Sequence, residues 1–431
     1  MRRSAIIISG GVLAVALVVA GGALLPERGG RVAAVEPASA GAGGDATARL
    51  EQRVRRLPGD WNAWAELGAA YVQRARTTAD PSHYASAERA LRRSLEIRPA
   101  GNVPALTGLG ALAAARHDFT AALRHGRDAL TADPYRASAY GVVADALVEL
   151  GRYDEAFQAV QKMVDLRPDT ASYARASYTW ELRGDLGRAR ATMGRALEAA
   201  ASPSDAAFAL YQLGELAFGS GDLATAAQHF DAGLRRDPAY LPLRVGQAKV
   251  RAARGDRAGA EAGYRAVLAV APLPGYAAEL GDLLAAAGDE RAAEQQYGLV
   301  RVTREVQAAA GVAPDVEIAL FDADHRQPGR ALTAARQIYD RQPSIAAADA
   351  LAWALHASGR SAEAVKYADQ ALRLGTRSAV LRYHRGMVLA AAGRVDAARA
   401  DLEAALRMNP HFSVRHAPIA RRTLASLGGP R

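Results

Sequence analysis

The stretch FDADHRQPG brings Asp322, Asp324 and His325 together within four residues. Carboxylate oxygens and an imidazole nitrogen are ligands that divalent metal ions accept, so these residue types could hold one. Polar residues at the end of a helix also cap it and face water, which needs no metal. The stretch therefore leaves a metal-dependent accessory role open, and we predict no cofactor.

Two other groups of residues imitate chemistry-bearing motifs. His411 and His416 are spaced so that they could share a face, as a pair of metal ligands does. The run GLGALA (108–113) imitates a dinucleotide-binding loop, but no strand pattern precedes it, and Gly110 falls where two helices meet. We interpret Gly110 as a helix-packing glycine.

The motifs of the common hydrolases and nucleotide-binding enzymes are missing from the sequence. It contains no HExxH, no phosphate-binding P-loop and no nucleophile elbow. It also has no cysteine, which excludes a cysteine nucleophile, a thiolate metal site and a disulfide framework. We therefore predict that the protein is not an enzyme.

The charge of the chain is basic and comes almost wholly from arginine. The net charge is +9, and Lys occurs only at positions 162, 249 and 366. Arg pairs at 92–93, 235–236 and 421–422 fall on predicted second helices without stacking aromatics between them, which is typical of a solvated convex face. We expect no nucleic-acid partner, although binding of nucleic acid or an envelope polymer to the Arg-rich surface stays an alternative.

The N-terminus predicts contact with a membrane. Arg2 and Arg3 precede the uncharged apolar stretch 4–26, which can cross a bilayer at about 1.5 Å per residue. Its length favours an uncleaved signal anchor. A cleaved signal peptide ending at Ala38-Ser39-Ala40 is the alternative. We predict a single-pass anchor over 1–26, a flexible linker over 27–44 and an extracytoplasmic remainder, or a secreted protein if cleavage occurs.

Beyond residue 45 the chain repeats. Half of its residues are apolar but only 6% are aromatic, which favours Ala-rich helices over sheets. A Gly, an Ala five residues later and a Pro twelve further recur as Gly151, Ala156 and Pro168; Gly221, Ala226 and Pro238; Gly255, Ala260 and Pro272; and Gly393, Ala398 and Pro410. The Gly ends a first helix, the Ala lets two helices approach closely, and the Pro stops the second helix. The period of about 34 residues predicts a helical solenoid.

The run WAELGAAY places Trp64, Leu67, Gly68 and Tyr71 in the order W-x2-L-G-x2-Y, and Ala87, Leu91 and Pro99 continue that pattern. The chain thus resembles the tetratricopeptide repeat family. This implies an all-α, right-handed superhelical solenoid of about ten helix pairs over 61–410. A half-repeat helix over 45–60 precedes it, and a capping helix and tail over 411–431 follow. The segments 169–205, 274–310 and 312–343 depart most from the pattern.

The resemblance also implies a function. Such arrays mostly bind proteins without chemistry of their own, and the second, fifth, ninth and twelfth residues of each unit face the concave groove. We therefore predict a protein-interaction scaffold whose partner is an unidentified protein or peptide. Carried over by register, the groove residues are Tyr178, Glu181, Phe208, Tyr211, Glu215, Phe218, Lys249, Asp282, Asp349, Trp353, His356 and Tyr383. Aromatics with a few charges are typical of binding hot spots, but they also fill core gaps between imperfect repeats.

Overall fold

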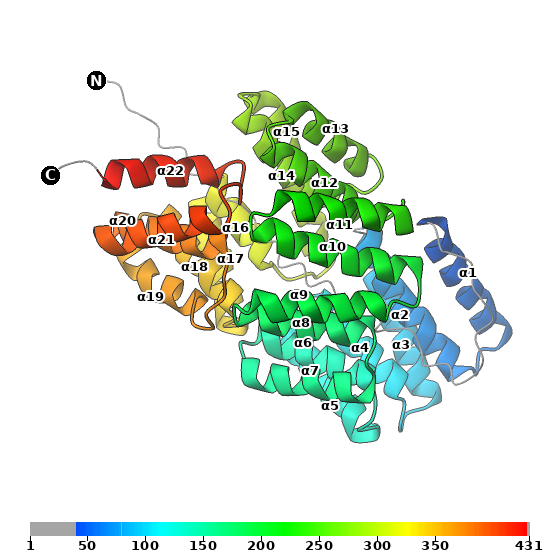
Figure 1. Ribbon diagram of the computed structural model, residues 1–431. Helices are drawn as coiled ribbons and strands as arrows, with labels where there is room; N and C mark the ends of the chain where they lie inside the picture. The colour runs from blue at the N-terminus through cyan, green and yellow to red at the C-terminus, as the bar shows by residue number, and fades with distance from the viewer. Residues whose placement is uncertain (1–39, 79, 429–431) are drawn as a thin grey trace.

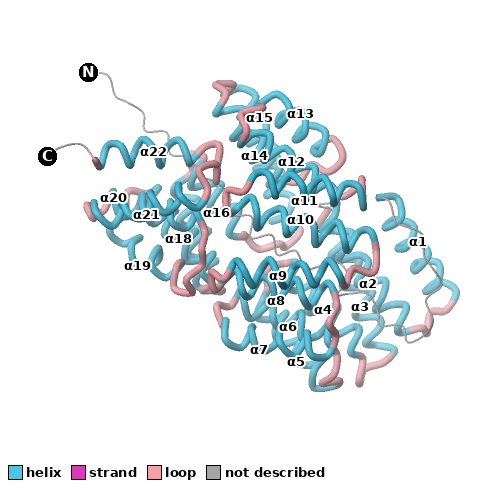
Figure 2. The backbone as a smooth tube through the Cα atoms, in the orientation of Figure 1, coloured by secondary structure: helices cyan, strands magenta, loops and turns pink. Residues whose placement is uncertain are grey.

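The computed structural model describes residues 40–78 and 80–428. Within them the chain forms 22 α-helices and no strand (Figure 1, Figure 2). No helix in this part of the chain is long and apolar enough to cross a membrane. The predicted anchor and most of the predicted linker lie outside the described residues and stay predictions.

Twenty of the helices form ten antiparallel pairs, the number that the repeat pattern predicts. The first helices of the pairs are α2 (Trp61–Thr78), α4 (Val103–Ala115), α6 (Ala137–Glu149), α8 (Thr170–Leu182), α10 (Pro203–Gly219), α12 (Leu241–Ala253), α14 (Pro274–Ala286), α16 (Val316–Asp324), α18 (Ile345–Ala357) and α20 (Ala379–Ala391). The second helices are α3 (Ser82–Ile97), α5 (Phe119–Ala132), α7 (Tyr153–Leu166), α9 (Leu186–Glu198), α11 (Leu223–Arg236), α13 (Arg257–Leu268), α15 (Glu290–Ala309), α17 (Pro328–Arg341), α19 (Ser361–Ala371) and α21 (Val395–Met408). Before and after the pairs come α1 (Ala40–Arg56), which begins ahead of the predicted boundary at residue 45, and α22 (His416–Leu427).

The repeated residues occupy the positions that their chemistry requires. Gly151 and Gly221 follow their first helices with φ of 69° and 80°, a left-handed backbone that residues with a Cβ resist. Ala156 and Ala226 have no exposed surface, because the paired helices meet at these positions. The spacing of Gly and Ala is therefore set by how each helix ends and how closely its partner approaches.

Two of the irregular segments depart from the repeat pattern in ways that the structure shows. In the pair over 312–343, Arg326 takes the left-handed conformation at φ of 61°, as His117 does at 59° in an earlier pair, where most other repeats carry Gly. The preceding pair ends in α15, which runs for 20 residues, and α16 that follows has only nine. The helices persist through these departures because tertiary packing of each pair outweighs local propensity.

The solenoid turns back onto itself. Four hydrogen bonds join residues near helix ends in the first half of the chain to residues in the second half. They are His117 Nδ1 with Ala313 O (2.9 Å), Ile345 N with Tyr153 Oη (2.7 Å), Thr376 Oγ1 with Leu182 O (2.5 Å) and Asn409 Nδ2 with Phe218 O (2.8 Å). Their sequence separations are 196, 192, 194 and 191 residues, or roughly 5.7 repeats of 34 residues. We call α4–α13 the first turn and α16–α22 the second turn, whose yellow-to-red helices rest beside α8–α11 in Figure 1.

The contact between the two turns gives a second reason why residue 151 is a glycine. A Cβ added to Gly151 would lie 2.5 Å from the Pro343 carbonyl oxygen of the second turn. Real Cβ atoms do not approach an oxygen so closely, so backbone has to shift if this position carries any other residue. Gly151 thus serves both the end of α6 and the close approach of the two turns.

Candidate functional site

A cavity of about 260 Å³ lies on the inner side of the superhelix. One wall consists of the first helices α8, α10, α12 and α14, which contribute side chains such as Glu181, Glu215 and Lys249. The opposite wall comes from the second turn, through α16, α18, the start of α20 and the loops 376–378 and 409–414. The cavity is therefore what remains of the concave surface once the second turn has packed against the first.

The cavity wall is rich in carboxylates. Five acidic side chains line it, namely Glu181, Glu215, Glu279, Asp282 and Asp349, against the cations of Lys249 and Arg377. Lys249 Nζ lies 2.5 Å from Glu215 Oε2, and the Tyr264 hydroxyl donates to Glu279 at 2.9 Å. No hydrogen bond from a described residue reaches the Glu181 carboxylate or Glu215 Oε1. The wall can thus offer acceptors to a basic or hydrogen-bond-donating group.

Burial shifts the titration of these groups. Burial, with the Glu215 charge adding to it, raises the pKa of Glu181 to about 7. Burial also raises the pKa of Glu279, against the opposing effect of Lys249. Although burial works against it, the pKa of Lys249 is raised by the carboxylates of Glu215 and Glu279. A cation entering the cavity would relieve the cost of ionising these acids away from water.

The structure brings together seven of the twelve predicted groove residues. The cavity is lined by Tyr178, Glu181, Glu215, Phe218, Lys249, Asp282 and Asp349. Glu215, Lys249 and Asp282 come from equivalent positions of three successive first helices, as their spacing predicts. Their role in binding a partner stays a prediction, but their common location on the inner surface is a finding.

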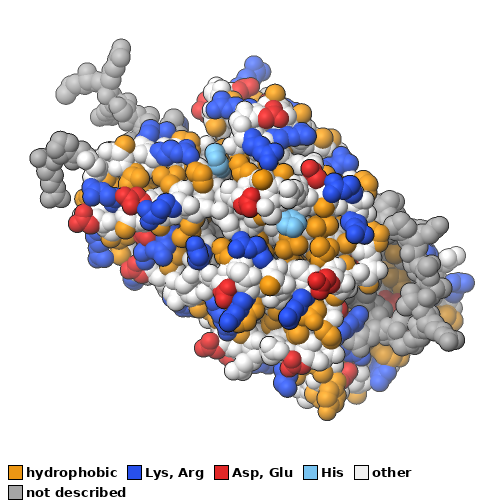
Figure 3. Space-filling view, in the orientation of Figure 1, with side chains coloured by type: hydrophobic (Ala, Val, Ile, Leu, Met, Phe, Trp, Pro, Cys, Tyr) orange, Lys and Arg blue, Asp and Glu red, His pale blue; other side chains and the backbone are white. Residues whose placement is uncertain are grey.

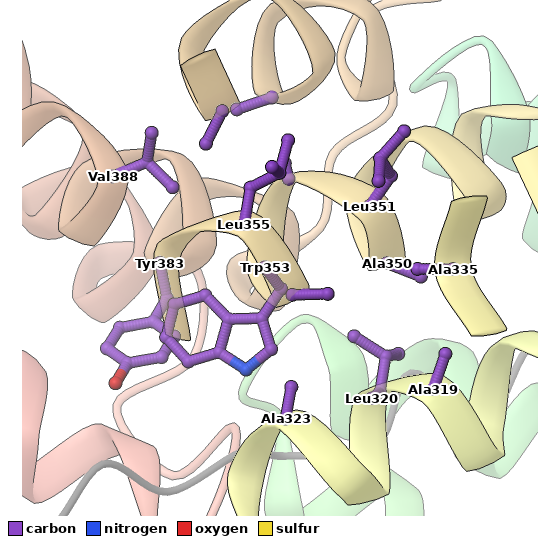
Figure 4. Close-up of a cluster of buried hydrophobic side chains, with 14 of the residues drawn as sticks. Ala319, Leu320, Ala323, Ala335, Ala350, Leu351, Trp353, Leu355, Tyr383 and Val388 are labelled. Atoms are coloured by element: carbon purple, nitrogen blue, oxygen red, sulfur yellow. The ribbon is translucent and has the colours of Figure 1, made fainter. Parts of the chain in front are cut away.

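The other five predicted residues pack elsewhere. Phe208 is 6% exposed and packs in the core between α8, α9 and α10, and Tyr211 is half-buried with its ring 6.2 Å from that of Phe230. Trp353 and Tyr383 have no exposed surface. Figure 4 shows the Trp353 indole beside Tyr383 and near Ala323 in the second-turn core. In this conformation these two aromatics fill the gap between imperfect repeats instead of facing an open groove.

A chain of polar contacts surrounds Trp353. Its indole N–H donates to Asp324 Oδ1 at 2.7 Å, and its ring lies 4.2 Å from that of His384. His384 Nδ1 in turn lies 2.9 Å from Asp349 Oδ2. His356 stacks on Trp353 at 5.0 Å, and burial lowers the pKa of its imidazole to about 4. Trp353, Asp324, His384 and Asp349 are each at most 2% exposed, whereas His356 is partly exposed and its Nδ1 lies 2.9 Å from Ser361 Oγ.

The residues of the possible metal site point to different partners. Asp322 pairs with Arg304 at 2.6 Å, Asp324 accepts from Trp353, and His325 Nδ1 lies 2.7 Å from the Phe321 carbonyl oxygen. Among the residues that the structure describes, no group of three or more His, Asp or Glu side chains could hold a metal ion. His411 and His416 also diverge, since His411 lines the cavity whereas His416 is wholly buried.

The remaining candidates are Gly110 and the Arg pairs. Gly110 lies in α4, and a Cβ there would come within 2.7 Å of Val142 Cγ1, which confirms a helix-packing glycine. The Arg pairs at 92–93, 235–236 and 421–422 are exposed as predicted, but only the first two lie on second helices. Arg421 and Arg422 lie on α22, which follows the last pair, so that part of the prediction is wrong. On the face shown in Figure 3, basic side chains stand among acidic and apolar ones instead of forming one continuous patch.

Sequence reasoning missed two parts of the cavity wall. Glu279 precedes Asp282 by three residues on α14, so helical spacing alone would have placed it on the same face. The loop residues 376–378 and 409–414 carry no such signal. They reach the cavity only because the second turn packs onto the first, which no local pattern encodes.

The described residues form a helical solenoid whose inner surface holds a cavity that opens to solvent. One model of the tetratricopeptide repeat matches residues 113–177, and a second matches 173–240, 350–413 and 383–426. The chain therefore carries tetratricopeptide repeats in both turns. The right-handed sense of the superhelix stays a prediction.

Three of the solved structures that resemble this chain are each at most 20% identical to it in sequence. A thermophilic tetratricopeptide repeat protein of Thermus thermophilus is 20% identical, covering 42% of this chain and 98% of its own, with a TM-score of 0.37. The Cut9–Hcn1 assembly of the APC/C is 13% identical, and the match covers 90% of this chain and 93% of the other, with a TM-score of 0.38. The human IFIT1 dimer with PPP-AAAA is 15% identical, and the match covers 76% of this chain and 77% of the other, with a TM-score of 0.45. No curated protein sequence matches the chain.

Proposed function

We propose that this chain is a non-catalytic scaffold whose inner surface receives a segment of a partner protein. Tetratricopeptide repeats generally mediate protein–protein interactions, and the matched stretches include α8 and α10, which line the cavity. The observation that carries the proposal is the makeup of the cavity wall. It combines aromatic and apolar side chains with five carboxylates, of which Glu181 has no partner among the described residues.

The chemistry of this wall suits a peptide segment. Apolar side chains such as Phe218 and Leu283 supply contact area, while Glu181 and Glu215 can accept hydrogen bonds from a backbone or a basic side chain. Tyr178 places an aromatic ring at one end of the same wall. Aromatic anchors with a few buried polar groups are what interface hot spots use.

A peptide selection tests this proposal directly. A random peptide library would be selected on the full-length chain in detergent, and the affinity of the enriched peptides would be measured for two variants. Glu181→Gln removes a cavity carboxylate and should weaken binding at least tenfold, because a hydrogen bond to a charged group contributes about 1.5–3 kcal/mol. Glu290→Gln removes the same charge from an exposed site on α15 and should leave binding unchanged.

Two outcomes of the selection count against the proposal. One is that no peptide is enriched above an unrelated protein. The other is that the enriched peptides bind the Glu181→Gln and Glu290→Gln variants equally well, which would place their site outside the cavity.

We further propose that residues 4–26 hold the solenoid at the cytoplasmic membrane on its outer side. This rests on the apolar length of the segment, which exceeds that of an ordinary signal peptide. The full-length protein should remain in the membrane fraction after a high-salt wash with an intact N-terminus. A mature chain that begins at Gly41 and is found in the medium would instead establish cleavage and secretion.

A further inference from the structure

The segment Asn409–His416, whose last residue begins α22, follows α21 and crosses the inner side of helices α10 to α14. At one end, Asn409 Nδ2 donates to the Phe218 carbonyl of α10 at 2.8 Å. At the other end, Arg415 reaches Asp282 of α14 at 3.0 Å. The residues 411–414 between them line the cavity. The segment therefore spans from α10 to α14, over the surface that α12 contributes.

Arg415 holds one end of this segment in place. Its Nη1 lies 3.0 Å from Asp282 Oδ1 and 3.0 Å from the Tyr297 hydroxyl oxygen, and its Nη2 donates to the Asp324 carbonyl at 2.9 Å. The Arg415 side chain is 12% exposed and that of Asp282 is 8% exposed. Hydrogen bonds between charged groups sheltered from water are the strong ones. Asp282, one of the predicted groove residues, thus already binds a guanidinium from its own chain.

Residues 409–416 reduce the room that the inner surface offers to a partner segment. The cavity volume of about 260 Å³ lies below the range of about 300–1,000 Å³ that ordinary small-molecule pockets have. An extended peptide advances about 3.3 Å per residue, so six residues need a groove roughly 20 Å long. Residues 411–414 take up the space beside α12 that an extended segment crossing from α10 to α14 would need.

We propose that Asn409–His416 is an internal strap that occupies the partner-binding surface, and that a partner segment binds by displacing it. This rests on the proposed function, since the strap has a regulatory meaning only if the inner surface binds a partner. The strap is tethered at both ends, which gives it a high effective concentration at the surface. The apparent affinity for a partner is then reduced by the fraction of molecules whose strap is open.

The absence of cysteine allows a direct measurement of strap opening. Ala252, which is partly buried on α12, lines the same cavity as strap residues 411–414, and Ala252→Cys introduces a thiol of similar size. The rate at which a maleimide labels this thiol reports the population of open molecules. In the Arg415→Ala background the rate should rise at least about tenfold, which corresponds to about 1.4 kcal/mol in the opening equilibrium. Equal rates in the parent and Arg415→Ala backgrounds would overturn the strap.

Two controls separate opening of the strap from general loosening. Arg407→Ala removes the same charge from an exposed residue of α21 and should leave the labelling rate at the parent value. Ala226→Cys places a thiol in the first-turn core, where the side chain has no exposed surface. If Arg415→Ala accelerated labelling of both thiols equally, the variant would be loosened throughout and the strap proposal would fail.

A second variant serves in case Arg415→Ala does not fold. Asn409→Ala removes the bond to Phe218 at the other end of the strap and should also accelerate labelling of Ala252→Cys but not of Ala226→Cys. The labelling needs no partner, so its failure bears on the strap alone. Failure of the peptide selection, repeated on whichever strap variant folds, bears on the proposed function.

Discussion

The two turns of the superhelix are stabilised in different ways. In the first turn, the Phe230 ring packs without exposed surface against Gly214 and Gly246, so its core is formed by apolar contacts between neighbouring repeats. In the second turn, the buried Trp353 donates to Asp324, and His384 contacts Asp349, across sequence separations of 29 and 35 residues. Both turns bond polar groups between repeats, but the first turn does so through ion pairs, Lys249 with Glu215 and Arg175 with Asp145, whereas the second turn bonds its buried aromatic core to carboxylates.

The largest expected effect tests the polar core of the second turn. Trp353→Ala removes a wholly buried ring and should cost about 3–5 kcal/mol of stability. Trp353→Phe keeps most of the apolar volume but leaves the Asp324 carboxylate without its indole donor, at a cost of about 1–3 kcal/mol. Urea unfolding of both variants measures the two contributions. If Trp353→Phe were as stable as the parent, the bond to Asp324 would not distinguish the second turn.

The second prediction concerns a buried carboxyl group in the first turn. Glu149 is 7% exposed at the end of α6, and burial, with a smaller contribution from Asp145, raises its pKa from 4.5 to about 7. Between these values the folded state holds a proton that the unfolded chain has lost, so stability falls as pH rises from about 4.5 to about 7. Glu149→Gln should therefore be up to about 3 kcal/mol more stable than the parent at pH 8 and no more stable at pH 4.

Urea midpoints at the two pH values measure this difference. Asp154→Asn is the matched control, because Asp154 is exposed on α7 and its loss changes the charge by the same amount. A Glu149→Gln variant whose stability followed the parent in parallel from pH 4 to pH 8 would contradict the prediction.

The contrast between the turns also explains what the sequence could predict. Ends of helices and contacts within a pair depend on residues close in sequence, so Gly221, Ala226 and Trp64 were enough to predict a solenoid of ten pairs. The stacking of the turns depends on how a small rotation per repeat accumulates over about 190 residues, which no short motif records. For that reason Asp282 was predicted to face the groove, but its contact with Arg415 was not.

The same argument applies to the aromatic residues. The repeat register placed Phe218 and Trp353 alike at groove-facing positions. Phe218 lines the cavity, whereas Trp353 is covered by neighbouring helices of the irregular repeats. Sequence register gives the direction in which a side chain leaves its helix, but what covers the side chain is decided by the packing of more distant repeats.

The third prediction probes the close packing of the first turn. Ala226 in α11 has no exposed surface, so Ala226→Leu forces three extra carbons into a filled contact and should cost about 1–3 kcal/mol. Unfolding should begin in the α10–α11 pair, because an array of this kind couples mainly neighbours. Hydrogen exchange of α10 and α11 against α20 and α21 measures this. Equal acceleration in both pairs would show that contacts between the turns make unfolding global.

The smallest effect compares how second helices begin in the two turns. In the first turn Asp222 caps α11 by accepting from the Thr225 N–H, whereas Arg394 at the same position of α21 makes no side-chain cap. An Asp at this position satisfies an otherwise unpaired N–H and places a negative charge at the positive end of the helix. Asp222→Ala should therefore cost about 1 kcal/mol, and Arg394→Asp should add a similar amount, since Arg394 is exposed and its replacement removes no packing. Thermal unfolding of the two variants measures both changes, which should have opposite signs. A loss of stability in Arg394→Asp would contradict the prediction. It would mean that Arg394 stabilises the second turn through contacts other than capping of α21.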